Sequence, residues 1–303
     1  MIAGGRYRIE NELRRGAFGV IYKGVYVKKG EPVAIKMDYS SRSSLKHEIR
    51  IIQYLSMKNV KGIPNIYWYG QYENKPCVVM TLFECSLYDY HKKGSPPSIL
   101  HLCKIMWLLL DIMENIHKNW VIHRDIKPHN FMIKGGEFYI IDFGLATFYM
   151  NESGEHCPNH GTETMIGSPY FASVHIHEGH SYSRRDDLIS LGYVLLFMTG
   201  FSWNDVYVSN PPIRQNDVND GRLDLSPLDI CFPMNQILHN KKRDIHSVFC
   251  ASSMRSGVKH VDEALADPLQ HYMEYVYRLE YDENPKYTPM KQLFSTVVAS
   301  LQT

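Results

Sequence analysis

Two groups of residues in the first fifty positions could carry chemistry on phosphates. The first is a turn containing Gly16 and Gly19, between two segments rich in β-branched and aromatic residues. Glycines in such a turn leave space for backbone amides to approach a phosphate group. The second is Lys36 on a short predicted strand, for which Glu48 on the next predicted helix is the natural partner if the lysine is buried. Each pattern alone is weak, because hairpins often contain glycines and edge strands often carry exposed lysines.

Two further motifs follow a long apolar segment. In the first, Asp125 could accept a hydroxyl proton, Lys127 could neutralise phosphoryl charge and Asn130 could hold a divalent ion. In the second, Asp142 comes twelve residues after Asn130 and directly after a predicted strand, where a carboxylate could be fixed as a Mg²⁺ ligand. The order and spacing of the four groups together favour phosphoryl transfer.

The elements that must position these residues change in character near residue 84. Before it, β-branched and aromatic runs predict five strands and an apolar stripe predicts one helix starting near Ser43. After it, apolar segments predict two long buried helices, and the polar stretch from about 206 to 260 fits no regular element. The predicted strands cover residues 7–13, 20–27, 33–37, 66–72 and 77–83, and the predicted helices cover residues 99–116 and 186–198.

Composition excludes several classes of protein. The 303 residues are 44% hydrophobic and 21% charged, as is typical of a globular protein with one bilobal unit or two domains. The net charge of +1 provides no field to recruit nucleic acid, so we expect no direct nucleic-acid binding. No apolar run approaches the ~20 residues of a membrane helix, so we expect no membrane insertion. We expect an intracellular protein of the cytoplasm or nucleus, with its six cysteines reduced.

Histidines gather at two places. One cluster is His156, Cys157 and His160, and the other is His175, His177 and His180. Zinc sites usually combine two ligand pairs at fixed spacing, and no second cysteine pair accompanies either cluster. The pattern therefore favours polar loop histidines over a metal site at both places.

The four groups resemble the motifs of the eukaryotic protein kinase superfamily, and the resemblance covers essentially the whole chain. Two segments are more specifically similar to the casein kinase I family. Residues 167–175 stand where most protein kinases carry Ala-Pro-Glu, and residues 183–195, with Arg184-Arg185-Asp186-Asp187, nearly repeat that family's signature. Pro285, Tyr287 and the Gln-Leu-Phe at 292–294 resemble its last helix.

This resemblance implies an α+β, bilobal protein-kinase fold. Residues 1–303 would form a single kinase domain without the long regulatory tail of many members. Its N-lobe, at about 7–83, would be a small antiparallel sheet with one helix, and its C-lobe, at about 84–303, would be mostly helical. The implied activity is transfer of the γ-phosphoryl group of ATP, with Mg²⁺, to serine or threonine hydroxyls of protein substrates by a monomer.

The resemblance also assigns roles to individual residues. Asp125 would be the catalytic base and Lys127 the charge stabiliser, while Asn130 and Asp142 would bind the metal. Asp187 would brace the catalytic loop. Residues 81–83 would form the hinge that reads adenine, next to the gatekeeper. The implied ATP-binding residues are Gly16, Gly19, Ile21, Ala34, Lys36, Glu48, Met80 and Phe83.

Three departures from the family pattern bear on activity and substrate. Arg14 replaces the first glycine of the glycine-rich loop, which leaves open a catalytically weak, pseudokinase-like binding or scaffold module. The family favours acidic or already phosphorylated substrates, but Tyr170 replaces one basic residue, so we expect weak dependence on priming. Arg184 and Arg185 could supply part of that charge or could simply form salt bridges at the head of a helix. Third, the polar segment before the final helices is longer than the family usually shows. It contains Lys-Lys-Arg at residues 241–243, which predicts either a localisation or docking patch or ordinary solvated surface.

A small-molecule kinase on the same fold is the third alternative. The segment from 167 to 175 resembles a surface that positions a peptide, and this favours a protein substrate. The complete set formed by Lys36, Asp125, Asn130 and Asp142 favours an active enzyme over the pseudokinase.

Overall fold

The computed structural model describes residues 2–16, 19–39, 44–94, 97–161, 165–201, 240, 242 and 263–302. The chain forms two compact units that do not divide at a single point in the sequence. The first consists of Met1–Lys93, Ile112–His123 and Pro128–Phe148, and the second of Gly94–Asp111, Arg124–Lys127 and Tyr149–Thr303.

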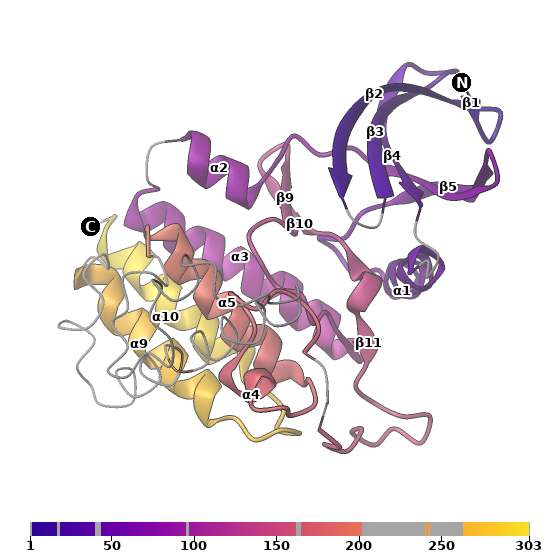
Figure 1. Cartoon of the computed structure of the whole chain (residues 1–303). Coiled ribbons are helices and arrows are strands. Elements are labelled where there is room, and N and C mark those ends of the chain that lie inside the picture. The colour runs from indigo at the N-terminus through magenta and orange to yellow at the C-terminus, as the bar shows by residue number, and fades with distance from the viewer. Residues whose placement is uncertain are drawn as a thin grey trace, which may run out of the picture. The chain divides into compact units, whose positions relative to one another are not determined.

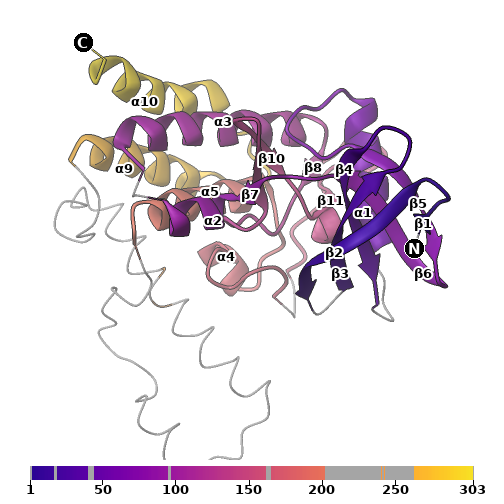
Figure 2. The same cartoon turned by 90° about the horizontal axis from the view of Figure 1, so that it is seen from above.

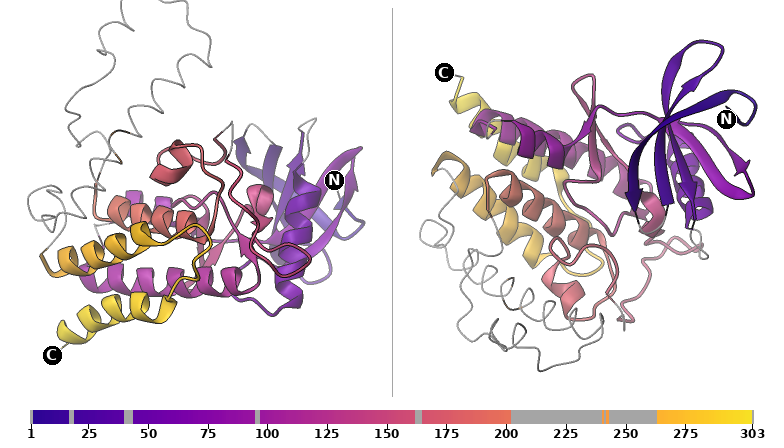
Figure 3. Two further views of the ribbon diagram at one scale, coloured as in Figure 1. Left: turned by 90° about the horizontal axis from the view of Figure 1, so that it is seen from below. Right: turned by 45° about the horizontal axis from the view of Figure 1, so that its top comes forward.

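The first unit is built on a six-stranded sheet that is antiparallel throughout and strongly curved (Figure 1; Figure 3). Its strand order is β1-β2-β3-β4-β6-β5, so β3 and β4 are the two central strands. The strands are β1 (Ile2–Ala3), β2 (Tyr7–Gly16), β3 (Gly19–Tyr26), β4 (Glu31–Asp38), β5 (Ile66–Tyr72) and β6 (Lys75–Thr81).

Successive residues of β4 point to opposite faces of this sheet, and both faces are covered. Val33, Ile35 and Met37 lie in one apolar cluster. Ala34 lies in a second cluster that includes residues of helix α1 (Leu45–Met57). Because side chains alternate along a strand, Lys36 lies on the same face as Ala34 and is directed toward α1.

Five short strands, one helix and a 3-10 turn complete the first unit. β9 (Phe131–Lys134) and β10 (Glu137–Ile140) form a hairpin whose turn, Gly135–Gly136, has positive φ at both residues. Two glycines in that conformation suit the tight turns that match the twist of a hairpin. The remaining elements of this unit are β7 (Cys85–Ser86), α2 (Leu87–Lys93), β8 (Val121–Ile122), a single turn of 3-10 helix (Phe143–Leu145) and β11 (Thr147–Phe148).

The second unit is organised around α5 (Arg184–Met198), which is buried along nearly all its length. A helix without a polar stripe belongs in the interior, and α9 (Glu263–Arg278) contacts both α5 and α10 (Tyr287–Ser300) (Figure 2; Figure 3). The Tyr272 hydroxyl donates to the Leu188 carbonyl oxygen at 2.7 Å. The short helix α4 (Val174–His177) lies in this unit, and α3 (Ile99–Lys118) contributes residues to both units.

These observations confirm the predicted α+β class, with an antiparallel sheet in the N-terminal region and helices in the C-terminal region. All five predicted strands and the three predicted helices form, with small shifts at their ends. The structure adds β1, which pairs with β2. The stretch from about 206 to 260 lies outside the described residues except for Asn240 and Lys242. In the described part of the chain, no helix is both long enough and apolar enough to cross a membrane.

Candidate active site

The central feature of the first unit is a cluster of Lys36, Glu48 and Asp142. Lys36 Nζ donates to Glu48 Oε2 at 2.7 Å and to Asp142 Oδ1 at 3.4 Å. Glu48 is buried on the inner stripe of α1, beside Leu45, Ile49 and Ile52. A carboxylate on an apolar stripe needs a charged partner, and the face on which Lys36 lies supplies it. The predicted pairing of Lys36 with Glu48 is therefore confirmed.

Burial and charge act in opposite directions on this cluster. Burial alone would lower the pKa of Lys36, but the Glu48 and Asp142 carboxylates outweigh it and raise that pKa above its usual value. Burial raises the pKa of Glu48, and Lys36 offsets part of that increase. Lys36 thus keeps its positive charge at neutral pH. A fixed ammonium is suited to pair with a phosphate oxygen, and an accessible carboxylate beside it is suited to bind a metal ion.

The hairpin β9–β10 explains the twelve-residue spacing of Asn130 and Asp142. Asn130 directly precedes β9 and Asp142 follows β10, so both residues lie at the open end of the hairpin. The Ile141 N–H donates to the Asn130 carbonyl oxygen at 2.9 Å and ties the two segments together. The Asp142 side chain is 47% exposed and therefore open to a ligand. Amide and carboxylate oxygens are the hard ligands that Mg²⁺ prefers, so the donor set fits this ion.

Two residues that the sequence analysis did not single out support Asp142. His123 Nε2 lies 3.0 Å from the Ile141 carbonyl oxygen, and its ring meets Phe143 edge-on at a centroid distance of 5.0 Å. The Asp142 backbone adopts a left-handed conformation with φ 67°, which aspartate tolerates better than most residues. The available signal for His123 and Phe143 was their place in the sequence, two residues before Asp125 and one residue after Asp142.

Three of the residues assigned to the adenine pocket come together. Ala34 and Met80 are paired across β4 and β6, and Ile21 packs against the same apolar cluster. Phe83, which was assigned to the hinge, packs its ring on Tyr139 at a centroid distance of 5.0 Å. The apolar cluster therefore brings together Ile21, Ala34 and Met80.

The two glycines of the first turn differ in their surroundings. Gly16 and Gly19 pair across β2 and β3, and residues 17–18 lie outside the described part. A Cβ on Gly19 would lie 2.0 Å from the Met37 carbonyl oxygen, whereas a Cβ on Gly16 would meet nothing within 4 Å. The close approach of β3 to β4 thus explains why residue 19 is a glycine. Gly16 faces open space, as a phosphate-binding glycine would.

The second unit holds Asp125 and Lys127. Lys127 Nζ donates to Asp125 Oδ2 at 2.6 Å and to Ser168 Oγ at 2.9 Å. The Arg124 N–H donates to Asp187 Oδ1 at 2.9 Å, which confirms the expected brace from α5. A Cβ on Gly167 would lie 2.5 Å from the Arg124 carbonyl oxygen. The segment beginning at Gly167 is therefore held directly against the Asp125 loop, and Ser168 is a partner that the sequence analysis missed.

The basic residues considered for substrate binding have structural contacts instead. Arg184 donates to Tyr149 Oη, Asn284 Oδ1 and the Asp282 carbonyl oxygen, and Arg185 donates to the Leu279 carbonyl oxygen. Both arginines are buried. They hold the chain around α9 and α10 to the start of α5, which agrees with a structural role at the head of this helix, although these hydrogen bonds, all within the described residues, go to neutral oxygens.

Lys242 is also buried, contrary to the prediction of solvated surface, and Lys241 and Arg243 lie outside the described residues. The Lys242 ammonium donates to the carbonyl oxygens of Pro169 and Ala172 and lies over the Tyr193 ring, 5.1 Å from the centroid. Burial holds the pKa of Lys242 well below its ordinary value. Tyr170, in contrast, is exposed.

A sheet-borne lysine paired with a helix glutamate, together with Asn130 and Asp142 at the end of one hairpin, is the arrangement of phosphotransferases that act on ATP. A family model for the protein kinase domain matches residues 7–217 of this chain. The chain therefore belongs to the protein kinase domain family. Membership implies that the chain uses ATP and acts on proteins.

Proposed function

We propose that this chain is an active serine/threonine protein kinase of the casein kinase I type. The observation that carries the proposal is the Lys36–Glu48–Asp142 cluster, with Asn130 tied to the same hairpin end. These are the charged and amide groups that a phosphoryl donor and its metal need, and each of them matches the residue type that the kinase motifs carry at that position. Arg14 at the first position of the glycine loop leaves Gly16, with open space around it, in place.

The proposed nucleotide-binding groups all belong to the first unit. The apolar surface of Ile21, Ala34 and Met80 would hold adenine, next to the hinge. Lys36 would contact the phosphates, and Glu48 would keep it in position. Asn130 and Asp142 would hold Mg²⁺, which supplies positive charge against the phosphate oxygens when bound.

The proposed acid–base groups belong to the second unit. Asp125 would accept the proton of the substrate hydroxyl while the hydroxyl oxygen forms a bond to the γ-phosphorus and the bond to the β-phosphate oxygen breaks, releasing ADP. Lys127 orients the Asp125 carboxylate through their 2.6 Å hydrogen bond and adds positive charge. Such a transition state requires mainly positioning and neutralisation of charge. Ser168 links this pair to the segment that we propose positions the substrate peptide.

Substrate preference follows from the charges near that segment. Tyr170 is exposed where the family carries a basic residue, and Arg184 and Arg185 are buried in structural contacts. We therefore propose that acidic or phospho-primed substrates are accepted with only weak preference over unprimed ones.

The experiment is phosphate transfer from Mg²⁺-ATP to a peptide library with serine, threonine and tyrosine acceptors in unprimed, acidic and phospho-primed contexts. The control is Asp142→Asn, because asparagine tolerates the left-handed backbone at this position. We expect transfer to serine and threonine that disappears in the variant. Nucleotide binding without any transfer above the variant would contradict the proposal and favour the scaffold alternative.

Tyr170→Arg tests the source of the substrate preference. A new guanidinium on this exposed position should form a charge-assisted hydrogen bond with a phosphorylated residue, and such a bond is worth roughly 1.5–3 kcal/mol. We expect the ratio of kcat/KM for primed over unprimed peptides to rise by about tenfold. Tyr170→Gln is the uncharged control and should leave the ratio near that of the wild type. An unchanged ratio in the arginine variant would show that priming is read elsewhere.

A further inference from the structure

The end of helix α4 brings two histidines and a glutamate together in one turn. Gly179 has φ 82°, its N–H donates to the Ile176 carbonyl oxygen, and the His180 N–H donates to the His175 carbonyl oxygen. This pair of bonds is the Schellman arrangement that ends a helix, in which the residue after the glycine meets a residue from the last helical turn. The two side chains that meet are usually apolar. Here they are His175 and His180, and Glu178 stands between them in sequence.

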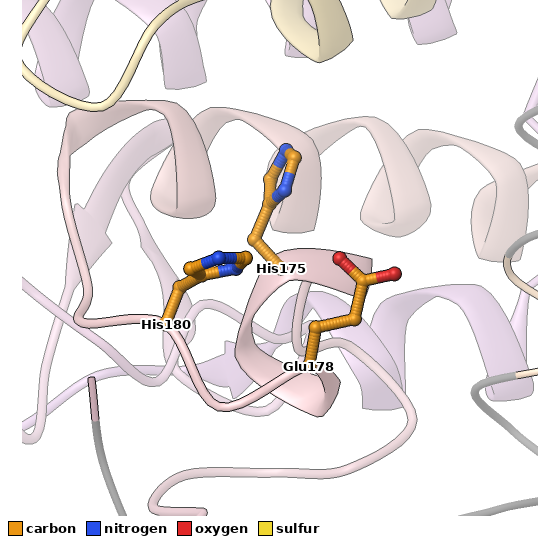
Figure 4. A group of neighbouring side chains, drawn as sticks. All are labelled: His175, Glu178 and His180. Atoms are coloured by element: carbon orange, nitrogen blue, oxygen red, sulfur yellow. The ribbon is translucent and has the colours of Figure 1, made fainter.

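The three side chains offer ligand atoms in close proximity. One atom from each of His175, Glu178 and His180 lies within 4.8 Å of the others, and Figure 4 shows all three projecting from this single turn. The His175 and His180 rings lie 6.0 Å apart, centroid to centroid. The Nδ1 atom of His180 is buried, and no hydrogen bond reaches it from the described residues. A buried imidazole nitrogen of this kind needs a ligand or a partner.

We propose that His175, Glu178 and His180 form a Zn²⁺ site. Two imidazoles and one carboxylate are a known three-ligand set for zinc, with water or another donor in the fourth position. Ligand atoms in a tetrahedral site with bonds of about 2.0–2.2 Å are about 3.3–3.6 Å apart, so the side chains need to close by little more than 1 Å. Glu178 is exposed and flexible enough to make most of that movement. Imidazole ligands disfavour Mg²⁺ and Ca²⁺, which prefer oxygen.

The other histidine of this region and the second histidine cluster are not part of the site. His177 Nε2 lies 3.1 Å from the Pro169 carbonyl oxygen and 3.1 Å from Lys242 Nζ, on a different side of the turn. His156 Nδ1 lies 2.8 Å from the Cys157 carbonyl oxygen. Within the described residues, His156, Cys157 and His160 do not form a metal-binding group.

Zinc at this place would stabilise the end of α4 and the turn that follows it. Ser173, the N-cap of α4, donates its hydroxyl hydrogen to Asp186, the carboxylate at the start of α5. The metal would therefore fix the C-terminal end of a short helix whose N-cap is already attached to α5. The site lies outside the groups proposed for catalysis, and its existence does not depend on kinase activity.

The test is metal binding by the full chain after removal of bound metal. Zn²⁺ affinity is measured by competition with a chromogenic chelator in excess Mg²⁺, which occupies carboxylate sites. We expect one zinc per chain, with affinity reduced at least about tenfold by His180→Ala or Glu178→Gln. His160→Ala is the matched control and should bind as the wild type does. Unfolding midpoints measured with EDTA show whether each variant is folded.

A second measurement identifies His180 as a ligand directly. His180→Cys replaces one zinc ligand by another, so this variant should retain binding. With Co²⁺ in place of zinc, it should gain a thiolate-to-cobalt charge-transfer band that the wild type lacks. Equal zinc binding by the wild type and His180→Ala, loss of binding in His160→Ala, or a thiolate band in the wild type would each overturn the proposal.

Discussion

Lys36 illustrates how single residues of this chain combine burial with charge. Its ammonium is held by one fully buried carboxylate, Glu48, and by one half-exposed carboxylate, Asp142. The buried partner sets the position of the ammonium, and the exposed partner remains accessible to a ligand. Burial would lower the pKa of an isolated lysine at this place, but the two carboxylates raise the pKa of Lys36 above its usual value.

Replacing Lys36 should therefore affect stability and catalysis through different partners. Lys36→Met leaves Glu48 buried beside an apolar chain, and we expect a loss of about 1–3 kcal/mol in the free energy of unfolding. Phosphoryl transfer should fall at least about 100-fold. The double variant Lys36→Met with Glu48→Gln should regain part of the stability but none of the activity. Chemical unfolding and single-turnover kinetics measure the two effects, and recovered activity in the double variant would contradict this account.

The two glycines of the first turn make a second comparison at the residue scale. Gly19→Ala places a Cβ against the Met37 carbonyl oxygen, so β3 must move away from β4, at a cost of about 1–3 kcal/mol. Gly16→Ala meets open space and should change stability by less than about 0.5 kcal/mol. If Gly16 lies against the phosphates, the same variant should raise the KM for ATP. Equal unfolding free energies for the two variants would show that β3 does not depend on that close approach.

At the scale of elements, α5 connects the polar segments of the second unit. Its first turn carries Asp186, which accepts from Ser173 Oγ and from the Ser183 N–H, and Asp187, which accepts from the Arg124 N–H. A carboxylate near a helix N-terminus is favourable, and these two also fix neighbouring segments. The element that forms the core of this unit thus also positions the Asp125 loop.

The charge of Asp186 makes the stability of this unit depend on pH. Burial raises the pKa of Asp186 to about 6, although the hydrogen bonds from Ser173 and Ser183 oppose the increase. The folded chain therefore holds this proton more tightly than the unfolded chain does. The contribution of Asp186 to stability is greatest below about pH 4 and decreases as the pH rises to about 6, by at most about 1.4 kcal/mol per pH unit.

Asp186→Asn removes the titrating carboxyl group, so a comparison of this variant with the wild type measures the pH dependence that Asp186 causes. The difference in unfolding free energy, wild type minus variant, should decrease between pH 4 and pH 6 and be constant above pH 7. Asp282→Asn is the control, since its backbone carbonyl, not its side chain, contacts Arg184. A difference that rises with pH over this window would mean that the pKa of Asp186 is lowered in the folded protein.

The elements were largely predictable because their signals are local. Residues 66–72 formed the predicted strand with the same ends, and the twelve residues between Asn130 and Asp142 accommodate one hairpin. Other contacts between distant segments were not predictable from local signals. Arg184 and Arg185 look like surface arginines in sequence, but they are buried and donate to carbonyl oxygens almost a hundred residues away. The end of α4 brings His175 and His180 together without involving His177, and this depends on the left-handed Gly179.

At the scale of the whole molecule, the two units contribute different parts of the proposed chemistry. The first unit contains the groups for nucleotide and metal, Lys36, Asn130 and Asp142. The second contains Asp125 and Lys127, within a segment that the chain connects at both ends to the first unit. The kinase family match spans parts of both units. In the proposed reaction, Asp125 accepts the proton of the substrate hydroxyl.

The rate of phosphopeptide formation by Asp125→Asn, measured together with its affinity for Mg²⁺-ATP, tests this claim most directly. Asparagine preserves the size of the side chain and can still accept from Lys127, but it cannot take the hydroxyl proton. The account predicts ATP affinity within about threefold of the wild type and a rate lower by roughly a thousandfold. A variant that transfers phosphate at the wild-type rate would contradict the account.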